Sequence, residues 1–363
     1  MPSVLNHPLG SSRFSNLVRM AARYGCEGRY LPRLVGVGLM SLLRQPVIAY
    51  EALRHGKAIR STDLPRDPVF VIGHWRSGTT HLQNILSKDP QFGSVTLKEA
   101  AMPLDFLTLG NLLSGPMAAS LPKKRLMDNV AVAADCPWEE ELALACTSPL
   151  SFYHVSFFPK AVGCIFQESI LFNDKDENLI TCWKNNYKTF LRKVQMVRPN
   201  RRLLLKNPAN SARIDLILRL FPEARFIHIH RDPLKVYAST IHLYLKAQEE
   251  WGFHRPDRSL VVEHVLQTYP LLMQAYLDQR SNIPEDRLVE VAFKDLQNQP
   301  MQVLENIYSD LRLPGFETAA PHFETYLHSV RGYTKNRLEL EPEETQQLRI
   351  RWKHFFETFG YGD

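Results

Sequence analysis

The sequence predicts an α/β fold in which a parallel sheet carries helices on both of its faces. Three observations support this class: short apolar runs typical of buried strands, helix-like segments between them, and a length that suits a large core. The chain has 363 residues, of which 44% are hydrophobic, enough to bury a sizeable core. Alternating strand and helix patterns indicate βαβ units. The predicted strands are Val69–Ile72, Leu203–Leu205, Phe226–Ile229 and Leu288–Val291.

We expect two regions along the chain. Residues 1–65 form a basic helical N-terminal extension, and residues 66–363 form the main domain that holds the sheet. Between residues 100 and 200 no strand pattern is clear, so this part of the main domain is predicted to be a helical insertion or lid. The chain shows no internal repeat and no low-complexity segment.

The positive charge is concentrated in the N-terminal extension. Residues 1–60 contain nine Arg and Lys and two Glu, a net charge of +7, whereas the whole chain carries +6. The main domain is therefore close to neutral, which argues against a nucleic-acid-binding surface there.

The extension also contains an apolar segment, Leu31 to Tyr50, which is interrupted by Arg33, Arg44 and Pro46. Its longest uncharged run before Arg44, Leu34 to Leu43, is too short to cross a bilayer. It lies too far from the start to be a secretory signal. Two interpretations stay open: peripheral attachment to an anionic membrane surface, and a helix packed on the main domain.

The cysteines and histidines indicate no disulfide framework and no metal site. The cysteines are odd in number and form no C-x2-C pair, at Cys26, Cys136, Cys146, Cys164 and Cys182. Free thiols and no secretory signal predict a cytoplasmic protein, with the inner membrane surface as a possible location. The thirteen histidines show no metal-binding spacing.

A glycine-rich turn follows the first predicted strand. Gly73 and Gly78 are separated by four residues, the spacing of a phosphate-binding loop between a strand and a helix. Thr79 and Thr80 replace the usual Lys-Ser/Thr, and Arg76 lies within the loop. Backbone N–H groups at a helix N-terminus attract phosphate. The loop therefore suits a phosphate in a P-loop-like fold but lacks the Lys that reaches a γ-phosphate; a purely structural turn is the alternative.

A second anion-binding pattern follows the strand Phe226–Ile229. Arg231 lies at the carboxyl end of that strand, where open α/β sheets bind ligands. Pro233 begins the next helix, and Ser239 follows Arg231 by eight residues, about two helical turns. Arg231 and Ser239 can hold one phosphate from two sides. The alternative is an ion pair and a helix cap.

With these two elements the chain resembles the PAPS-dependent sulfotransferases, in a bacterial branch related to the protein-tyrosine sulfotransferases. RSGTT (Arg76 to Thr80) resembles their 5′-phosphosulfate loop, and RDPLKVYAST (Arg231 to Thr240) their 3′-phosphate element. The resemblance spans about Asp67 to Tyr361. Two departures concern the acceptor side: FEDL of the family is FKDL here, and PQEDEFAL is PWEEELAL. Further matching segments are Leu203 to Pro233, Gly73 to His81, Arg125 to Val132 and Pro137 to Ala145.

The resemblance implies PAPS as the donor, no metal, and in-line transfer to an acceptor hydroxyl. Arg76 with Ser77, Gly78, Thr79 and Thr80 would hold the 5′-phosphate, and Arg231 with Ser239 the 3′-phosphate. Lys206 ends a strand 25 residues before Arg231, as the matching Lys does in the protein-tyrosine enzymes, and would contact the leaving oxygen. Arg331 and Lys335, in a late basic loop, would complete the 3′-phosphate pocket.

The general base is expected to be a carboxylate. Glu99 lies 23 residues after Arg76, close to the distance of the catalytic Glu in the protein-tyrosine branch. Glu139 and Glu141 of the PWEEE run are the alternatives, although Glu at a helix start also offsets the helix dipole. His74 and His81 flank the loop and are expected to position or pack.

Two other function classes compete with sulfuryl transfer. A kinase or NTPase would use the same loop, but the Lys after Gly78 is missing and an Arg stands where a magnesium-binding Asp is expected. A membrane-surface binding protein with a decayed site would not need Arg76, Lys206, Arg231 and Ser239. The sequence leaves the acceptor open among glycans, lipid headgroups, small molecules such as phenols, and peptide tyrosines.

Overall fold

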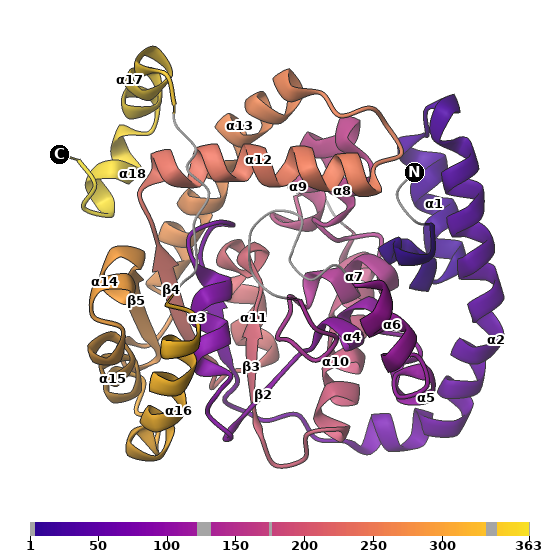
Figure 1. The fold of residues 1–363 in the computed structure, drawn as a ribbon, viewed down its shortest axis with the longest axis horizontal. Helices are drawn as coiled ribbons and strands as arrows, with labels where there is room; N and C mark the ends of the chain where they lie inside the picture. Colours follow the sequence, from indigo (N-terminus) through magenta and orange to yellow (C-terminus); the bar gives the residue numbers. More distant parts are fainter. Residues whose placement is uncertain (1–3, 122–131, 174–175, 332–339, 363) are drawn as a thin grey trace. The chain divides into compact units, whose positions relative to one another are not determined.

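The computed structural model describes residues 4–121, 132–173, 176–331 and 340–362 (Figure 1). The chain divides into two compact units. The first comprises residues 1–65, 93–201 and 244–260, and the second comprises residues 66–92, 202–243 and 261–363. Each unit is described by itself below.

The sheet has strand order β2-β3-β1-β4-β5 (Figure 1). β1, β3, β4 and β5 belong to the second unit, whereas β2 has residues in both units. β1 pairs in parallel with β3 and with β4, and β4 pairs in parallel with β5. The α/β class and all four predicted strands are confirmed, with ends that differ by at most one residue. The strands are β1 (Val69–Ile72), β2 (Phe92–Ser94), β3 (Arg202–Lys206), β4 (Arg225–His230) and β5 (Leu288–Ala292).

β2 was not predicted. It consists of Phe92, Gly93 and Ser94, so it contains one large apolar residue and no apolar run. Short strands of this kind leave no periodic signal in a sequence.

Helices cover both faces of the sheet, which explains why its middle strand β1 is apolar throughout. Val69 and Val71 of β1 belong to one core with Leu82 and Ile85 of α3. On the opposite side, Phe70 contacts Phe221 at the end of α11, with ring centroids 6.0 Å apart. Helices lying wholly in the second unit are α3 (Thr79–Leu86), α11 (Ile214–Leu220), α14 (Phe293–Asn298), α15 (Pro300–Asp310), α16 (Phe316–Ser329), α17 (Pro342–Arg351) and α18 (Lys353–Thr358).

The first unit is mainly helical. Its largest elements are α2, which runs without interruption through Pro46, and α10. Two further helices, α12 (Pro233–Trp251) and α13 (Arg258–Arg280), have residues in both units. The helices of the first unit are α1 (Phe14–Tyr24), α2 (Leu31–Ser61), α4 (Leu97–Ala101), α5 (Phe106–Leu109), α6 (Ser114–Ser120), α7 (Glu141–Thr147), α8 (His154–Phe157), α9 (Val162–Ser169) and α10 (Glu177–Met196).

The described parts of residues 1–65 and 100–200 are mainly helical, and both segments belong to the first unit. The division into an extension and a main domain at residue 65 stays a prediction. Across the described residues, every helix is either too short or too polar to traverse a bilayer.

Candidate functional site

The predicted phosphate-binding loop lies between β1 and α3, and its two glycines are required by close packing. Gly73 has φ 135°, and a Cβ there would lie 2.2 Å from the carbonyl oxygen of Ile229 in β4. Gly78 has φ 110°, and its Cβ would lie 2.3 Å from the Phe293 ring. Both positions therefore exclude other residues by backbone conformation and by space.

The loop bends back on itself at Arg76, which has φ 70°, an uncommon conformation for a residue other than glycine. Arg76 Nε donates a hydrogen bond to Ser239 Oγ at 2.8 Å. Arg231 Nη1 in turn donates to the Arg76 carbonyl oxygen at 3.2 Å. The structure therefore brings Arg76, Arg231 and Ser239 into one cluster, although the sequence assigned them to two separate phosphates.

Phe293 forms one wall of this cluster. The guanidinium carbon of Arg231 lies 4.8 Å from the centre of the Phe293 ring, a cation–π distance. The same ring limits the space at Gly78. Phe293 thus positions both the loop and Arg231, a role that sequence reasoning missed because the residue appeared only as the first letter of FKDL.

Two serines, one outside the loop and one within it, contribute to its structure in different ways. Ser211, in the short helix Pro208–Ala212, accepts a hydrogen bond from Gly73 N at 2.8 Å and so holds the start of the loop. The sequence gave Ser211 no role. Ser77 is 1% exposed, and its Oγ has no hydrogen-bond partner among the described residues. A buried hydroxyl without a partner is costly, and a bound oxyanion would satisfy it.

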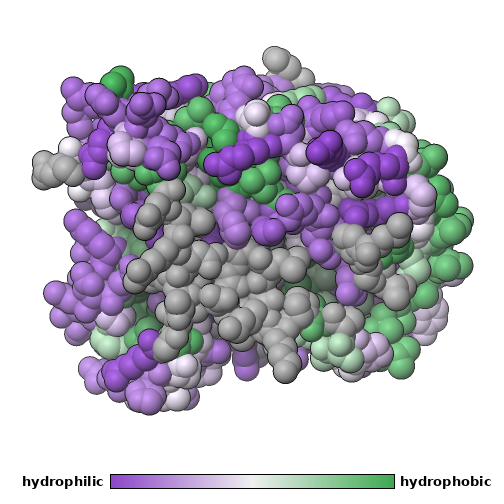
Figure 2. Space-filling model, turned by 45° about the horizontal axis from the view of Figure 1, so that its top comes forward, coloured by the Kyte–Doolittle hydropathy of each residue, from purple (hydrophilic) through white to green (hydrophobic). Residues whose placement is uncertain are grey.

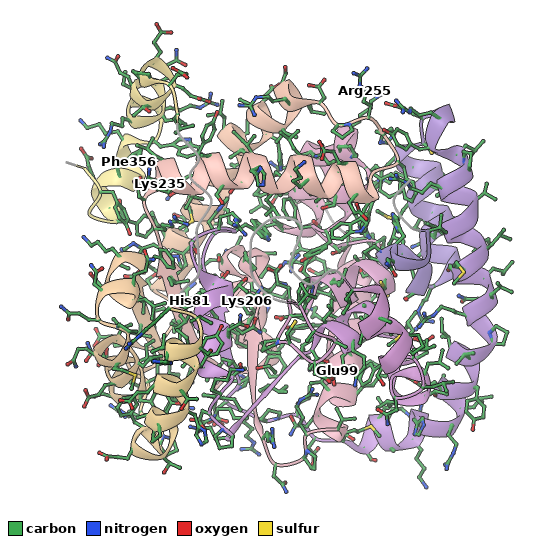
Figure 3. All side chains as sticks on the ribbon, viewed as in Figure 1. His81, Glu99, Lys206, Lys235, Arg255 and Phe356 are labelled. Carbon is green, nitrogen blue, oxygen red and sulfur yellow. The ribbon has the colours of Figure 1, made fainter. Side chains whose placement is uncertain are left out.

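Lys206 is the last residue of β3 and is 2% exposed (Figure 3). It is paired in register with Val71, two residues before Gly73. Because β1 and β3 are parallel, Lys206 lies at the edge of the sheet from which the loop starts. Thr79 and Thr80 form the first turn of α3.

Of the two histidines that flank the loop, His74 is poorly suited to proton transfer. His74 is buried, and burial lowers its pKa to about 4. Its Nδ1 donates to the Trp75 carbonyl at 2.8 Å, and its ring lies 5.0 Å from that of Tyr269. His74 is therefore neutral and packed. His81 lies in the first two turns of α3 (Figure 3).

Glu99 belongs to the first unit and is 3% exposed (Figure 3). One carboxylate oxygen accepts from Arg198 Nη1 at 2.7 Å, and the other accepts from Thr96 N at 2.9 Å. Thr96 Oγ1 accepts from Glu99 N at 3.4 Å, which completes a capping box at α4. Glu99 therefore stabilises the N-terminus of α4, independently of any role in catalysis.

The two alternative carboxylates also lie in the first unit. Glu141 Oε1 accepts from Ser151 Oγ at 3.0 Å and from Phe152 N at 2.8 Å. Glu139, two residues earlier, is 9% exposed.

The late basic loop is only partly described. Arg331 is exposed and follows α16, whereas Lys335 lies outside the described residues, as does nearly all of the segment from Arg125 to Val132. Within the described part of the chain, His, Cys, Asp and Glu side chains form no group of three or more that could hold a metal ion.

Comparison with known proteins decides the family. Residues 68–318 match the sequence model of the sulfotransferase family. The chain belongs to this family. It is 30% identical over 324 residues to omega-hydroxy-beta-dihydromenaquinone-9 sulfotransferase Stf3 of Mycobacterium bovis, covering 89% of this chain and 82% of that relative. The sulfotransferase is therefore an enzyme that transfers a sulfuryl group.

Two solved structures have the same fold. Sulfotransferase STF9 from Mycobacterium avium gives a TM-score of 0.68 at 19% identity, covering 96% of each chain. Sulfotransferase STF1 from Mycobacterium tuberculosis gives 0.67 at 16% identity, covering 93% of this chain and 90% of that one. The likeness supports the P-loop-like α/β architecture expected from the sequence.

Proposed function

We propose that this sulfotransferase uses PAPS as its donor and an acceptor hydroxyl, less favourably an amine, as its substrate. The observation that carries the proposal is the cluster of Arg76, Arg231 and Ser239, in which residues from two anion-binding elements contact one another. A nucleotide with phosphates at both 3′ and 5′ positions matches two adjacent basic elements. The buried, unpartnered Ser77 hydroxyl supports an oxyanion at the loop.

The residues of the loop and of the β4–α12 junction would divide the donor between them. Ser77, Gly78, Thr79 and Thr80, with Arg76, would hold the 5′-phosphate at the N-terminus of α3. Arg231 and Ser239 would hold the 3′-phosphate, and Arg331 and Lys335 would close that pocket.

When bound, PAPS supplies a sulfuryl group whose bond to the bridging phosphate oxygen breaks as the acceptor oxygen bonds to sulfur. Lys206, at the edge of the sheet beside the loop, would stabilise the negative charge that develops on the departing oxygen. The residues of the site would hold the two oxygens in line, which requires neither a metal nor a covalent intermediate.

The carboxylate that removes the acceptor proton is proposed to be Glu99, with Glu139 and Glu141 as the alternatives. Glu99 forms an ion pair with Arg198, in which Arg198 Nη1 and Glu99 Oε1 are 2.7 Å apart. Its two oxygens already accept hydrogen bonds, so proton transfer would require one of these bonds to be exchanged for one to the acceptor.

The acceptor is proposed to be a small molecule or a lipid that carries a hydroxyl, with a glycan as the alternative. The Mycobacterium bovis relative is named for an omega-hydroxylated dihydromenaquinone, which is an apolar molecule. We further propose that residues 1–60 contact the inner surface of the cytoplasmic membrane, where an acceptor of that kind would be found.

Calorimetry with PAP and ATP tests the donor. PAP should bind and ATP should bind much more weakly. Arg231→Ala should lose about 1.5–3 kcal/mol of PAP binding free energy and Ser239→Ala less, because the Arg contact is charge-assisted. Unchanged PAP affinity in both variants would remove the 3′-phosphate assignment.

Steady-state kinetics test the chemical roles. Lys206→Ala should lower kcat by about 10²–10³-fold with little change in PAP affinity. Glu99→Gln should lower kcat by about 10²–10⁴-fold if Glu99 is the base. Normal turnover in Glu99→Gln, together with loss in Glu139→Gln or Glu141→Gln, would assign the base to the PWEEE run.

A further inference from the structure

The outer side of α2 is apolar along most of the helix. Between residues 31 and 53, every residue that is classed as exposed is apolar, except Tyr50. Figure 2 shows these apolar residues gathered along the edge of the molecule where Figure 1 draws α2. We call six of them the outer row of α2: Leu31 (52% exposed), Val35 (53%), Leu39 (56%), Leu42 (48%), Leu43 (72%) and Leu53 (86%).

Within the length of the outer row, the charged residues of α2 point the other way. Arg44 forms two hydrogen bonds to Asp105, at 2.9 and 2.6 Å, and Asp105 is fully buried. Glu51 is 1% exposed, pairs with Lys193 of α10, and accepts from Thr108 N at 2.8 Å. The inner side of α2 is thus mixed, since Val37 and Ile48 are buried there beside Ser41 and Glu51, whereas its outer side is apolar. A helix that packs on a protein core and faces water has a polar outer side instead.

The residues that interrupt the apolar segment in the sequence do not interrupt the outer row. Arg33 donates to the Gly252 carbonyl oxygen at 2.8 Å, and Arg44 is engaged with Asp105. The outer row therefore runs from Leu31 to Leu53, about 33 Å at the rise of an α-helix. An uninterrupted exposed apolar strip of this length marks an interaction surface.

The charge around the row favours an anionic surface. Arg54, Lys57 and Arg60 are exposed and follow the row directly, and Arg29 is exposed just before it. Both acidic residues of segment 1–60 form ion pairs: Glu51 with Lys193, and Glu27 with Lys160 at 2.8 Å. Basic residues at the ends of an apolar strip are typical of helices that lie in the headgroup region of a bilayer.

We infer that α2 lies in the plane of an anionic lipid bilayer, with its outer row among the acyl chains and Arg54, Lys57 and Arg60 at the phosphates. The inference rests on the membrane contact proposed above for residues 1–60 and specifies the surface that makes it. No rearrangement of the first unit is needed, because the buried ion pairs already hold the apolar side outward.

Co-sedimentation with vesicles tests the inference. The full-length protein should bind vesicles of equimolar phosphatidylcholine and phosphatidylglycerol in low salt, and bind phosphatidylcholine alone less well. Part of the binding should persist at about 1 M salt, where the Debye length is about 3 Å. Neutralising Arg54, Lys57 and Arg60 to Gln should weaken the low-salt binding by roughly fivefold per residue.

A matched pair of double variants isolates the outer row. Leu39→Ser with Leu43→Ser should raise the lipid concentration for half-maximal binding by at least about tenfold, because two apolar side chains no longer leave water. The control is Leu112→Ser with Ile350→Ser, since both side chains are 72% exposed, as Leu43 is, but neither belongs to α2. The control should bind vesicles like the wild type.

Each other outcome overturns the inference in a recognisable way. Equal vesicle binding by the two double variants would mean that the protein binds the membrane through a surface other than the outer row. Failure of the wild type to bind anionic vesicles would remove both. A wild-type dimer in light scattering that becomes a monomer in Leu39→Ser/Leu43→Ser would assign the row to a second copy of the chain. Sulfuryl transfer to a water-soluble acceptor, measured in the same variants, reports separately on the proposed activity.

Discussion

Strand β1 of the second unit buries its apolar side chains, whereas helix α2 of the first unit exposes many of its own. All four residues of β1 are fully buried between two layers of helices. In α2 the side chains that face the protein include Ser41, Arg44 and Glu51, whereas leucines face outward. An apolar run in a sequence therefore identifies a surface that avoids water, but not whether protein or another medium covers it.

The ion pairs of α2 decide its orientation. Burial raises the pKa of Asp105 although Arg44 opposes this, and burial lowers the pKa of Lys193 although Glu51 opposes this. A buried ion pair of this kind contributes little net free energy to folding. Removing one partner is nevertheless strongly destabilising, because the other charge stays buried without a counter-charge. The pairs therefore fix which side of α2 faces inward more than they stabilise the unit.

The largest effect is expected from breaking one of these pairs. Lys193→Met leaves the Glu51 carboxylate buried without its counter-charge and should lower the free energy of unfolding by about 3–5 kcal/mol. The matched control is Lys246→Met, which breaks the exposed pair with Glu249 and should cost less than about 1 kcal/mol. Urea denaturation measures both. Similar small losses in the two variants would show that the inner side of α2 is not held by charge.

A second prediction compares leucines of the two regions directly. Leu204→Ala, at a fully buried position of β3, should cost about 2–5 kcal/mol. Leu43→Ala, on the outer row, should change the free energy of unfolding by no more than about 0.5 kcal/mol in the absence of lipid. If Leu43→Ala is as destabilising as Leu204→Ala, then protein covers the outer row in solution, and the contrast between the regions fails.

The same contrast explains how much could be predicted from the sequence. Strands buried on both faces, such as β1 and β3, give continuous apolar runs. β4 and β5 contain His228 and Glu290 but are otherwise apolar enough to be found, and the order of motifs led to the family. β2 has no such run. The direction in which α2 faces depends on Asp105 and Lys193, which are distant in the sequence, so the pattern of α2 alone left two interpretations open.

The candidate site was predicted in part for a similar reason. Gly73, Gly78 and Arg231 follow predicted strands, and local spacing was enough to single them out. The bond from Arg76 to Ser239 and that from Gly73 to Ser211 join residues more than 100 positions apart. No local pattern reports such contacts, and Phe293 was missed because packing against Gly78 has no signature in FKDL.

The third and smallest prediction concerns His74, a buried polar residue of the second unit. Burial lowers the pKa of His74 to about 4, against about 6.5 in an unfolded chain. Because the folded pKa is the lower one, the unfolded state binds more protons, and stability present at pH 7 is lost as the pH falls from about 6.5 to about 4. Between pH 7 and pH 5 this amounts to about 2 kcal/mol for His74.

Urea denaturation of His74→Gln at pH 7 and pH 5 measures the contribution of His74 to this loss of stability. The variant should lose about 2 kcal/mol less than the wild type on going from pH 7 to pH 5, because glutamine does not titrate. His322→Gln, at an exposed position of α16, controls for the substitution itself. An identical loss in the wild type and in His74→Gln would mean that His74 is protonated inside the fold.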